Sequence, residues 1–357
     1  IHRGIESGED RPDVEGREVV YYLKGLAKVV ETFEVISGNF ELTAEGYREE
    51  NRIYLDPENG SRNLASLLIR PPEDWSVLDY IPAGSLGVTA GYLDFGKVYG
   101  YLLGYLGRDP VNGEKLKAGW ETLQNQWGFH PADDLFSWLG DEYAAATLSA
   151  PTSIMDPGSF AYLVEVTSGK DLERNLVRLF NFLEKQGITT VEDEYQEAKM
   201  RIVYLPVPTL PLTPTLGQVG DYLVLASRQD EFRRVVDTLK ESVPGIRSDA
   251  DFQKMQKRLG ETGTDFTFVR LEERIDSLVT LIRSSSSMVG MIAASQSASE
   301  SDESSRDDIK PEEIVGLMND IALVLEDLKV FKFFGMSSRW QGDYLKISEF
   351  IEIGPQE

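Results

Sequence analysis

The chain has 357 residues, of which 41% are hydrophobic and 27% charged, so it can bury the cores of about two ordinary domains. Its formal net charge of −24 argues against nucleic acid and against an anionic membrane surface as partners, because clusters of Lys and Arg bind both. The absence of cysteine excludes disulfides, thiolate nucleophiles and Cys-ligated zinc or iron–sulfur clusters.

The sequence favours an extracytoplasmic location, in the periplasm or cell envelope. A chain without cysteine is compatible with export, since it has no thiols to mispair in an oxidising space. The sequence begins at Ile1 rather than Met, as it would after removal of a signal peptide or membrane anchor. No run of about 18 apolar residues is present to span a bilayer. We expect residues 1–16 to form a disordered polar tail.

Hydrophobic spacing and turn residues predict the elements of the first half in chain order. These are a helix over 18–32, hairpin strands over 36–43 and 52–55, a turn over 56–60, a strand over 85–93, a helix over 95–106, a helix with Trp120 and Trp127, a short helix over 131–138 and a strand over 143–148. Gly96, Gly100 and Gly104 lie on one side of the second helix, where small residues allow another backbone to approach closely. We interpret this side as close packing within the domain, with an oligomer-forming or lipid-facing helix as the alternative.

The second half is predicted in the same way. Its elements are strands over 160–166, 200–205, 222–226 and 265–270, helices over 169–186, 228–241, 250–259, 271–283 and 311–328, and two final strands around Gly342. Ser168 with Asp171, and Ser227 with Asp230, are typical of helix N-caps. Residues 284–309 are rich in serine and acidic residues, and we expect them to form a mobile loop because they cannot bury enough apolar surface.

Two segments predict an internal duplication. Trp138-Leu139-Gly140-Asp141 and Trp340-Gln341-Gly342-Asp343 both read as a tight turn that leads into a strand. The strand–helix segment over 87–106 is matched by the one over 265–283, and the turn at Gly46 by the turn at Gly220. The offset between the copies then grows by about the length of the serine-rich stretch.

The fold predicted from these observations is α+β, with two similar lobes over 17–156 and 157–357 and the loop 284–309 inserted in the second. Each lobe would be a mostly antiparallel sheet with helices packed on one face. A parallel α/β fold is the alternative, because strand-then-helix order recurs.

The segment from Phe129 to Glu142, with its short acidic helix and Trp-Leu-Gly-Asp-Glu sequence, resembles the hallmark of a bacterial exported family catalogued as domain of unknown function 3352. The segment from Gly220 to Ser227 resembles a later turn–strand element of that family. The resemblance covers residues 60–353 and implies an N-terminal signal or anchor. It implies no activity, catalytic residue or cofactor.

The sequence carries no catalytic or cofactor signature, and we assign no catalytic, cofactor-binding or metal-binding residue. Of the two histidines, His2 lies in the predicted tail and His130 at a helix start, where a structural role is expected. The leading hypothesis is a non-enzymatic protein that binds an unknown small molecule or protein, in a groove between the lobes.

Two other functions stay open. One is a hydrolase that uses carboxylates such as Asp133 and Asp141, with Asp134 and Glu142 in the same cluster. It requires these carboxyl groups to converge in one pocket. The other is a structural or assembly protein that uses the helix with Gly96, Gly100 and Gly104 as its contact surface.

Overall fold

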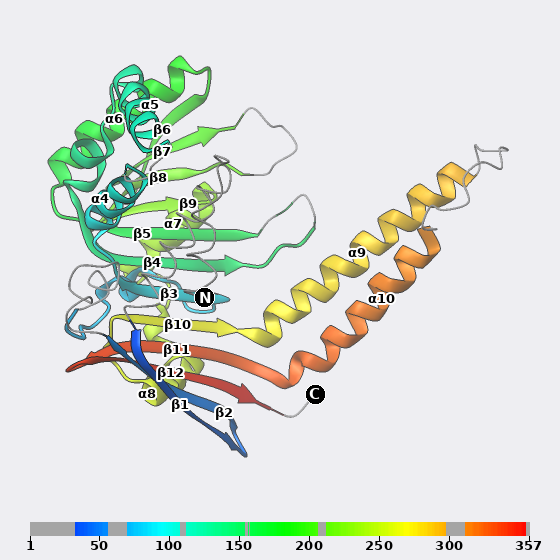
Figure 1. Ribbon diagram of the computed structural model, residues 1–357. Helices are drawn as coiled ribbons and strands as arrows, with labels where there is room; N and C mark the ends of the chain where they lie inside the picture. The colour runs from blue at the N-terminus through cyan, green and yellow to red at the C-terminus, as the bar shows by residue number, and fades with distance from the viewer. Residues whose placement is uncertain are drawn as a thin grey trace, which may run out of the picture.

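The strands form one continuous antiparallel sheet (Figure 1). A computed structural model describes residues 33–55, 70–107, 112–153, 156, 158–205, 212–297 and 311–354. Across the sheet, the twelve strands of this part run in the order β1-β2-β12-β11-β10-β3-β4-β5-β9-β8-β7-β6. Their bounds are β1 (Phe33–Thr43), β2 (Gly46–Leu55), β3 (Gly87–Tyr92), β4 (Leu139–Ser149), β5 (Ser159–Val166), β6 (Thr189–Tyr195), β7 (Ala198–Tyr204), β8 (Thr215–Val219), β9 (Tyr222–Ala226), β10 (Asp265–Arg270), β11 (Phe331–Gln341) and β12 (Tyr344–Ile353). The predicted α+β class is confirmed, and the parallel alternative is wrong.

The centre of the sheet is the antiparallel pair of β3 and β10, where the Thr89 and Thr267 hydroxyl groups lie 3.1 Å apart. On one side of this pair the order is β3, β4, β5, then the hairpin β9–β8, and finally β7 and β6. On the other side the order is β10, β11, β12 and then the hairpin β2–β1. Each side therefore ends with strands from the other half of the chain. The two separate lobes that we predicted are not seen, and the predicted boundary at 156/157 falls between β4 and β5, which pair with each other.

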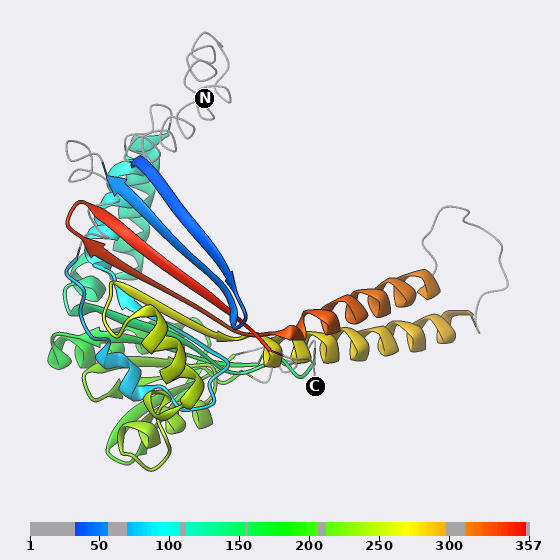
Figure 2. The same cartoon turned by 90° about the horizontal axis from the view of Figure 1, so that it is seen from below.

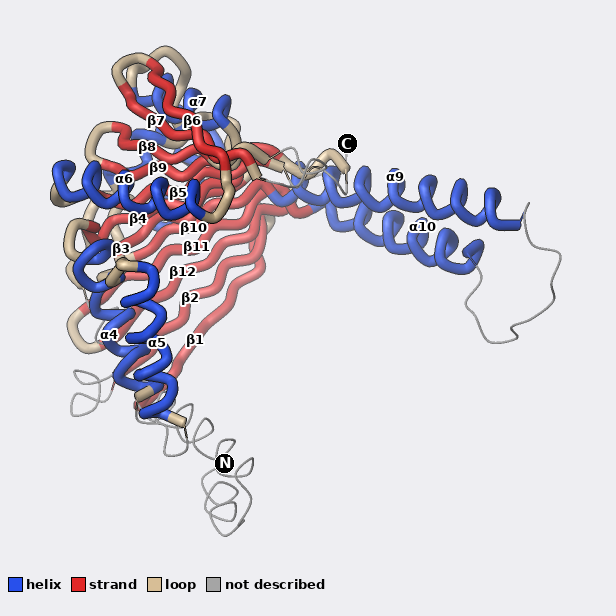
Figure 3. The backbone as a smooth tube through the Cα atoms, turned by 90° about the horizontal axis from the view of Figure 1, so that it is seen from above, coloured by secondary structure: helices blue, strands red, loops and turns tan. Residues whose placement is uncertain are grey.

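Helices lie on both faces of the sheet, as the opposite views of Figures 2 and 3 show. In the described part they are η2 (Ser76–Tyr80), α4 (Phe95–Leu106), α5 (Gly113–Trp127), the π-helical turn η3 (Pro131–Phe136), α6 (Gly169–Lys185), α7 (Gln229–Leu239), η4 (Ile246–Ser248), α8 (Ala250–Leu259), α9 (Leu271–Ser297), α10 (Pro311–Asp327) and η5 (Leu328–Val330). α7 and α8 cover one face, and α4, α5 and α6 lie on the other. The prediction of helices on one face only is therefore wrong.

The face under α7 and α8, which we call the core face, carries the main hydrophobic core. From β11 to β7, one row of paired residues on this face is buried at every position: Gly335, Phe268, Val88, Ala146, Ala161, Ala226, Thr215 and Ile202. Trp75 and Phe252 have no exposed surface and pack against Phe266, with ring centroids 5.3 and 5.4 Å away. Burial of such side chains stabilises the fold by about 1.5–3 kcal/mol each.

The opposite face, which we call the open face, is not sealed. The adjacent row of paired residues contains no buried side chain: Phe40, Glu49, Glu349, Met336, Thr267, Thr89, Ala145, Tyr162, Leu225, Leu216, Arg201 and Glu192. Because side chains alternate between the faces of a strand, this row differs from the buried one by a single residue along each strand. Tyr162 is 47% exposed near the middle of the sheet.

Helices α9 and α10 form a hairpin that projects away from the sheet (Figure 1). Ile275 and Val279 of α9 pack against Ala322 of α10, which is 1% exposed. The hairpin also keeps large apolar side chains at its surface, among them Met291, Leu317, Leu323 and Val324.

The serine-rich segment corrects one prediction, because residues 284–297 continue α9 instead of forming a mobile loop. The hydroxyl groups of Ser285 and Ser287 donate to the carbonyl groups of Leu281 and Arg283 in the preceding turn, at 2.7 and 3.1 Å. Serine is therefore satisfied inside the helix, and packing against α10 outweighs its modest helix propensity. The rest of the predicted loop lies outside the described residues.

The two Trp-x-Gly-Asp segments are not equivalent turns. Gly342 lies in the β11–β12 turn with φ 69°, a left-handed conformation that favours glycine. Gly140 lies inside β4, where a Cβ would collide with the side chain of Glu165. Trp138 precedes β4 and is 2% exposed, whereas Trp340 is half-buried near the end of β11. The predicted correspondence of Trp138 with Trp340 is therefore wrong.

Several other predicted features have a clear outcome. Helices 95–106 and 250–259 and strands 222–226 and 265–270 have the predicted bounds. Strands β6 and β8 were not predicted. Ser168 is the N-cap of α6, but its hydroxyl donates to Asp171 Oδ2 at 2.7 Å, and Arg228, not Ser227, is the N-cap of α7. The predicted tail, the helix over 18–32 and the turn over 56–60 lie outside the described residues.

Within the described ranges, no helix is both long enough and apolar enough to cross a membrane.

The close contact at Ala322 gives a test of the hairpin. Ala322→Leu would add side-chain volume where α10 meets Ile275 and Val279, and overpacking of this kind costs about 1–3 kcal/mol. We expect faster amide hydrogen exchange throughout α10. The control is Leu323→Ala, a neighbour that is 57% exposed and should change stability by less than about 0.5 kcal/mol. Equal effects of both substitutions would contradict the packing described.

Candidate functional site

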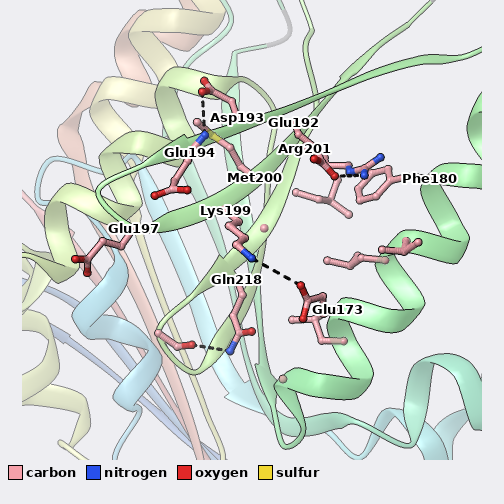
Figure 4. Close-up of a pocket in the computed structure, with 17 residues that line it drawn as sticks. Glu173, Phe180, Glu192, Asp193, Glu194, Glu197, Lys199, Met200, Arg201 and Gln218 are labelled. Carbon is pink, nitrogen blue, oxygen red and sulfur yellow. Dashed lines mark hydrogen bonds and ion pairs between the residues drawn. The ribbon is translucent and has the colours of Figure 1, made fainter.

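One cavity in the described part is a groove on the open face, between α6 and the strands β6, β7 and β8 (Figure 4). Its volume is about 820 Å³, which is within the range of pockets that hold small organic ligands. Its floor is apolar, because Leu172 and Phe180 of α6 are each at most 2% exposed. Leu176 and Leu216 extend this apolar surface toward the opening.

The local sequence explains how these side chains reach the groove. The stripe Leu172, Leu176, Leu179, Phe180 and Leu183 recurs at helical spacing and gives α6 one apolar side. Gly187, with φ 80°, follows the end of this helix.

On β7, alternation places Met200 and Ile202 in the core and turns Lys199 and Arg201 toward α6. The guanidinium of Arg201 lies 4.9 Å from the centroid of the Phe180 ring, a cation–π contact that ties β7 to α6.

Carboxylates outnumber cations around the opening. The acidic side chains that line the groove are Glu173, Glu192, Asp193, Glu194 and Glu197, and the basic ones are Lys199 and Arg201. Lys199 Nζ reaches across from β7 to within 3.8 Å of Glu173 Oε1 on α6 (Figure 4). Both side chains are at least 75% exposed, so solvent screens this pair strongly. Glu192 pairs with Arg201, Asp193 with Arg233 and Glu197 with Lys240, so cations at or near the groove balance part of its negative charge.

The arrangement can bind but offers little for catalysis. Among the described residues that line the groove there is no histidine or serine to act as a base or a nucleophile. Within the described ranges, no group of three or more potential metal-binding side chains occurs. What the groove does combine is an apolar floor and an acidic rim, which together suit a ligand with an apolar body and a positive charge.

The carboxylates of the predicted acidic cluster do not gather at one cavity, and none lines the groove. Asp134 is buried, pairs with Arg178 Nη1 at 2.7 Å and accepts a bond from the backbone N–H of His130 at 2.7 Å. Asp141 pairs with Arg70 Nη1 at 2.7 Å, and Asp133 is exposed. The structure therefore does not place these carboxyl groups around one common cavity where they could act on the same substrate.

Glu142 is buried for a structural reason. Its carboxylate accepts hydrogen bonds from Ser76 Oγ at 2.6 Å, from the backbone N–H of Val77 at 3.0 Å and from the hydroxyl of Tyr222. These bonds hold the first turn of η2 against β4 and β9. Burial, followed by the bond to Glu142, raises the pKa of Tyr222 well above its usual value.

The other residues singled out from sequence lie away from the groove. His130 is exposed, and its Nδ1 lies 3.2 Å from Gln124 Oε1. A Cβ added to Gly96 would lie 3.5 Å from Phe136 Cβ, but a Cβ added to Gly100 or Gly104 would have no described atom within 4 Å. The close packing expected along this side of α4 is therefore not seen at Gly100 and Gly104.

Sequence reasoning did not identify the groove. The helix over 169–186 that carries Leu172 and Phe180 was predicted, but β6 and β8, which supply the opposite wall, were not. One usable signal was the segment Lys199-Met200-Arg201, in which charged residues flank a buried one at strand spacing.

Comparisons with protein-family models, with curated proteins and with solved structures gave no match for this chain. The resemblance of Phe129–Glu142 to the family with the Trp-Leu-Gly-Asp-Glu motif therefore stays a prediction.

The contrast between Glu142 and its neighbour Asp141 gives a test of their roles. Glu142→Ala would leave three donors without their acceptor in the interior, and we expect a loss of about 3 kcal/mol in the free energy of unfolding. Asp141→Ala removes an ion pair in which the Asp141 side chain is 42% exposed, and should cost at most about 1 kcal/mol. Urea denaturation of both variants measures the difference, and similar losses would contradict the structural role of Glu142.

Proposed function

We propose that the protein is a non-enzymatic binding protein whose groove between α6 and β6–β8 takes a small ligand with an apolar body and a positively charged group. The observation that carries the proposal is the combination of a buried apolar floor at Leu172 and Phe180 with an excess of acidic over basic residues in the lining. A cationic group would lie among these carboxylates while its apolar body covers Leu176 and Leu216.

The separation of the acidic cluster favours binding over hydrolysis. A carboxylate-dependent hydrolase needs two carboxyl groups that act on one substrate. Asp134 is engaged by Arg178 and Asp141 by Arg70, and neither lines the groove. The space beside Gly100 and Gly104 is open within the described chain, so the assembly hypothesis based on α4 stays an alternative.

We also propose that the chain arose by internal duplication and acts outside the cytoplasm. The duplication is supported by the strand order, in which β3-β4-β5 with hairpin β9–β8 corresponds to β10-β11-β12 with hairpin β2–β1. In this correspondence a helix pair follows each central strand, α4 with α5 after β3 and α9 with α10 after β10. The extracytoplasmic location is supported by the cysteine-free sequence and by the family resemblance.

A fluorescent amine tests the binding proposal. Dansylcadaverine carries an apolar dye and one primary amine, and we expect its emission to shift to the blue as it saturates the protein. The variant Glu173→Gln/Glu192→Gln/Glu194→Gln removes three rim charges, and its affinity should fall by about tenfold or more, since each tenfold is about 1.4 kcal/mol. Added salt should weaken binding to the unmodified protein.

The matched control removes three acidic groups elsewhere. Glu312→Gln/Glu313→Gln/Asp320→Asn changes three exposed residues of α10 and leaves the groove intact. This variant should bind the amine as the unmodified protein does, and the uncharged dansylamide should bind weakly to all three proteins. An equal loss in both variants would mean that net charge attracts the dye, and an unchanged affinity in the groove variant would contradict the proposed site.

A further inference from the structure

A second cavity on the open face contains an arginine that no described acidic group neutralises. Arg274, in the first turn of α9, lines a cavity of about 170 Å³ beside Thr147 of β4. Its Nη2 donates to Thr147 Oγ1 at 2.8 Å. Gly87 of β3 leaves room for the guanidinium, because a Cβ at Gly87 would lie only 3.1 Å from Nη2.

The pairing of Arg274 differs from that of Arg270, one turn earlier in the chain. Arg270 is 7% exposed and is neutralised by Asp249 at 2.5 Å and Asp251 at 3.0 Å. Arg274 forms no ion pair with any described residue, and its Nε is buried without an acceptor. Burial lowers the pKa of Arg274, which is the direction expected for a cation without a partner.

An unpaired arginine is costly in this protein. The chain has 60 acidic and 36 basic residues, so carboxylates are abundant, yet none is placed beside this guanidinium in the described part. A guanidinium has five N–H donors, and Arg274 uses one of them on Thr147. The remaining donors suit the two oxygens of a carboxylate, which a guanidinium binds in a fork.

The walls of the cavity indicate which chemical groups the ligand carries next to its carboxylate. They are formed by the aromatic rings of Phe160 and Tyr162, by Val269, and by small residues such as Ala145. Tyr162 is 47% exposed, so the cavity opens onto the apolar surface of the open face. The cavity has room for the acidic head of a ligand, with an apolar body lying over the two rings.

We propose that Arg274 is the anchor of a second binding site, which takes the carboxylate of a small monocarboxylic acid with an apolar body. This site is separate from the groove at α6, since Phe160, Tyr162 and Arg274 line one cavity and not the other. It also has the opposite charge preference. A phosphate dianion fits less well, because the described cavity offers one cation and apolar walls.

Titration with phenylacetate tests the proposal directly. With arginine selectively labelled by ¹⁵N, the Nε–H resonance of Arg274 is assigned by its loss in Arg274→Lys. We expect phenylacetate to shift this resonance at saturation. Calorimetry should give an affinity that falls by roughly tenfold or more in Arg274→Gln, as expected for a hydrogen-bonded charged group.

The controls separate recognition at Arg274 from general charge attraction and from apolar contact alone. Arg283→Gln changes a 52% exposed arginine of the same helix that pairs with Glu326, and it should leave phenylacetate affinity unchanged. Uncharged phenylacetamide should bind at least about tenfold more weakly, by the same argument. Thermal unfolding of Arg274→Gln in the absence of ligand shows whether the variant folds, and Arg274→Lys, which keeps the charge, should retain part of the affinity.

Three results would overturn the proposal. The first is no shift of the Arg274 resonance with phenylacetate, and the second is equal affinity in Arg274→Gln and the unmodified protein. The third is tighter binding of inorganic phosphate than of phenylacetate. None of these outcomes depends on dansylcadaverine binding, so the proposals for the groove at α6 and for the cavity at Arg274 are tested independently.

Discussion

The structure depends on the antiparallel pairing of β3 with β10, which joins strands from distant parts of the chain into one sheet. Once Thr89 is paired with Thr267, the alternation of side chains decides which face each residue of β3 and β10 points to, and pairing extends this assignment to the neighbouring strands. A shift of one residue in this pair would place Phe268 on the open face and Thr267 in the core. The burial of Phe266 and Phe268 under Trp75 and Phe252 therefore fixes the register of the whole sheet.

This constraint also explains where the two sites lie. Over its central strands, from β11 to β7, the core face is buried under the packed helices and leaves no space for a ligand. The open face is covered only in part by α4, α5 and α6; one cavity lies beside α6, and the other is lined by strand residues and by Arg274 of α9. At one, Leu216 and Arg201 face α6; at the other, Tyr162 lies near Arg274. A single sheet thus carries both proposed sites, one with an acidic lining and one with an arginine, on the same face.

Sequence reasoning recovered what local chemistry determines. α4 and α8 and strands β9 and β10 have the predicted bounds, because caps, glycines and regular apolar spacing mark them. It failed where distant contacts decide. β6 (Thr189–Tyr195) carries three successive acidic residues and is a strand because β7 pairs with it. Residues 284–297 are helical because α10 packs beside α9. The segments at Trp138 and Trp340 are similar in sequence but do not occupy equivalent positions in the fold. Neither cavity could be predicted from the sequence. The groove needs β6 and β8 as its wall, and Arg274 stands out only because no described acidic residue pairs with it, which the sequence does not show.

The central claim is that one face of a single sheet is closed and the other is available for ligands. Hydroxyl-radical footprinting of the whole protein in solution, read by mass spectrometry, tests it most directly. We predict strong modification of Tyr162 and Met336 on the open face, and protection of Phe266 and Phe268 on the core face. Protection of Tyr162 and Met336 to the level of Phe268 would mean that the open face is covered in the native protein, and would contradict this account.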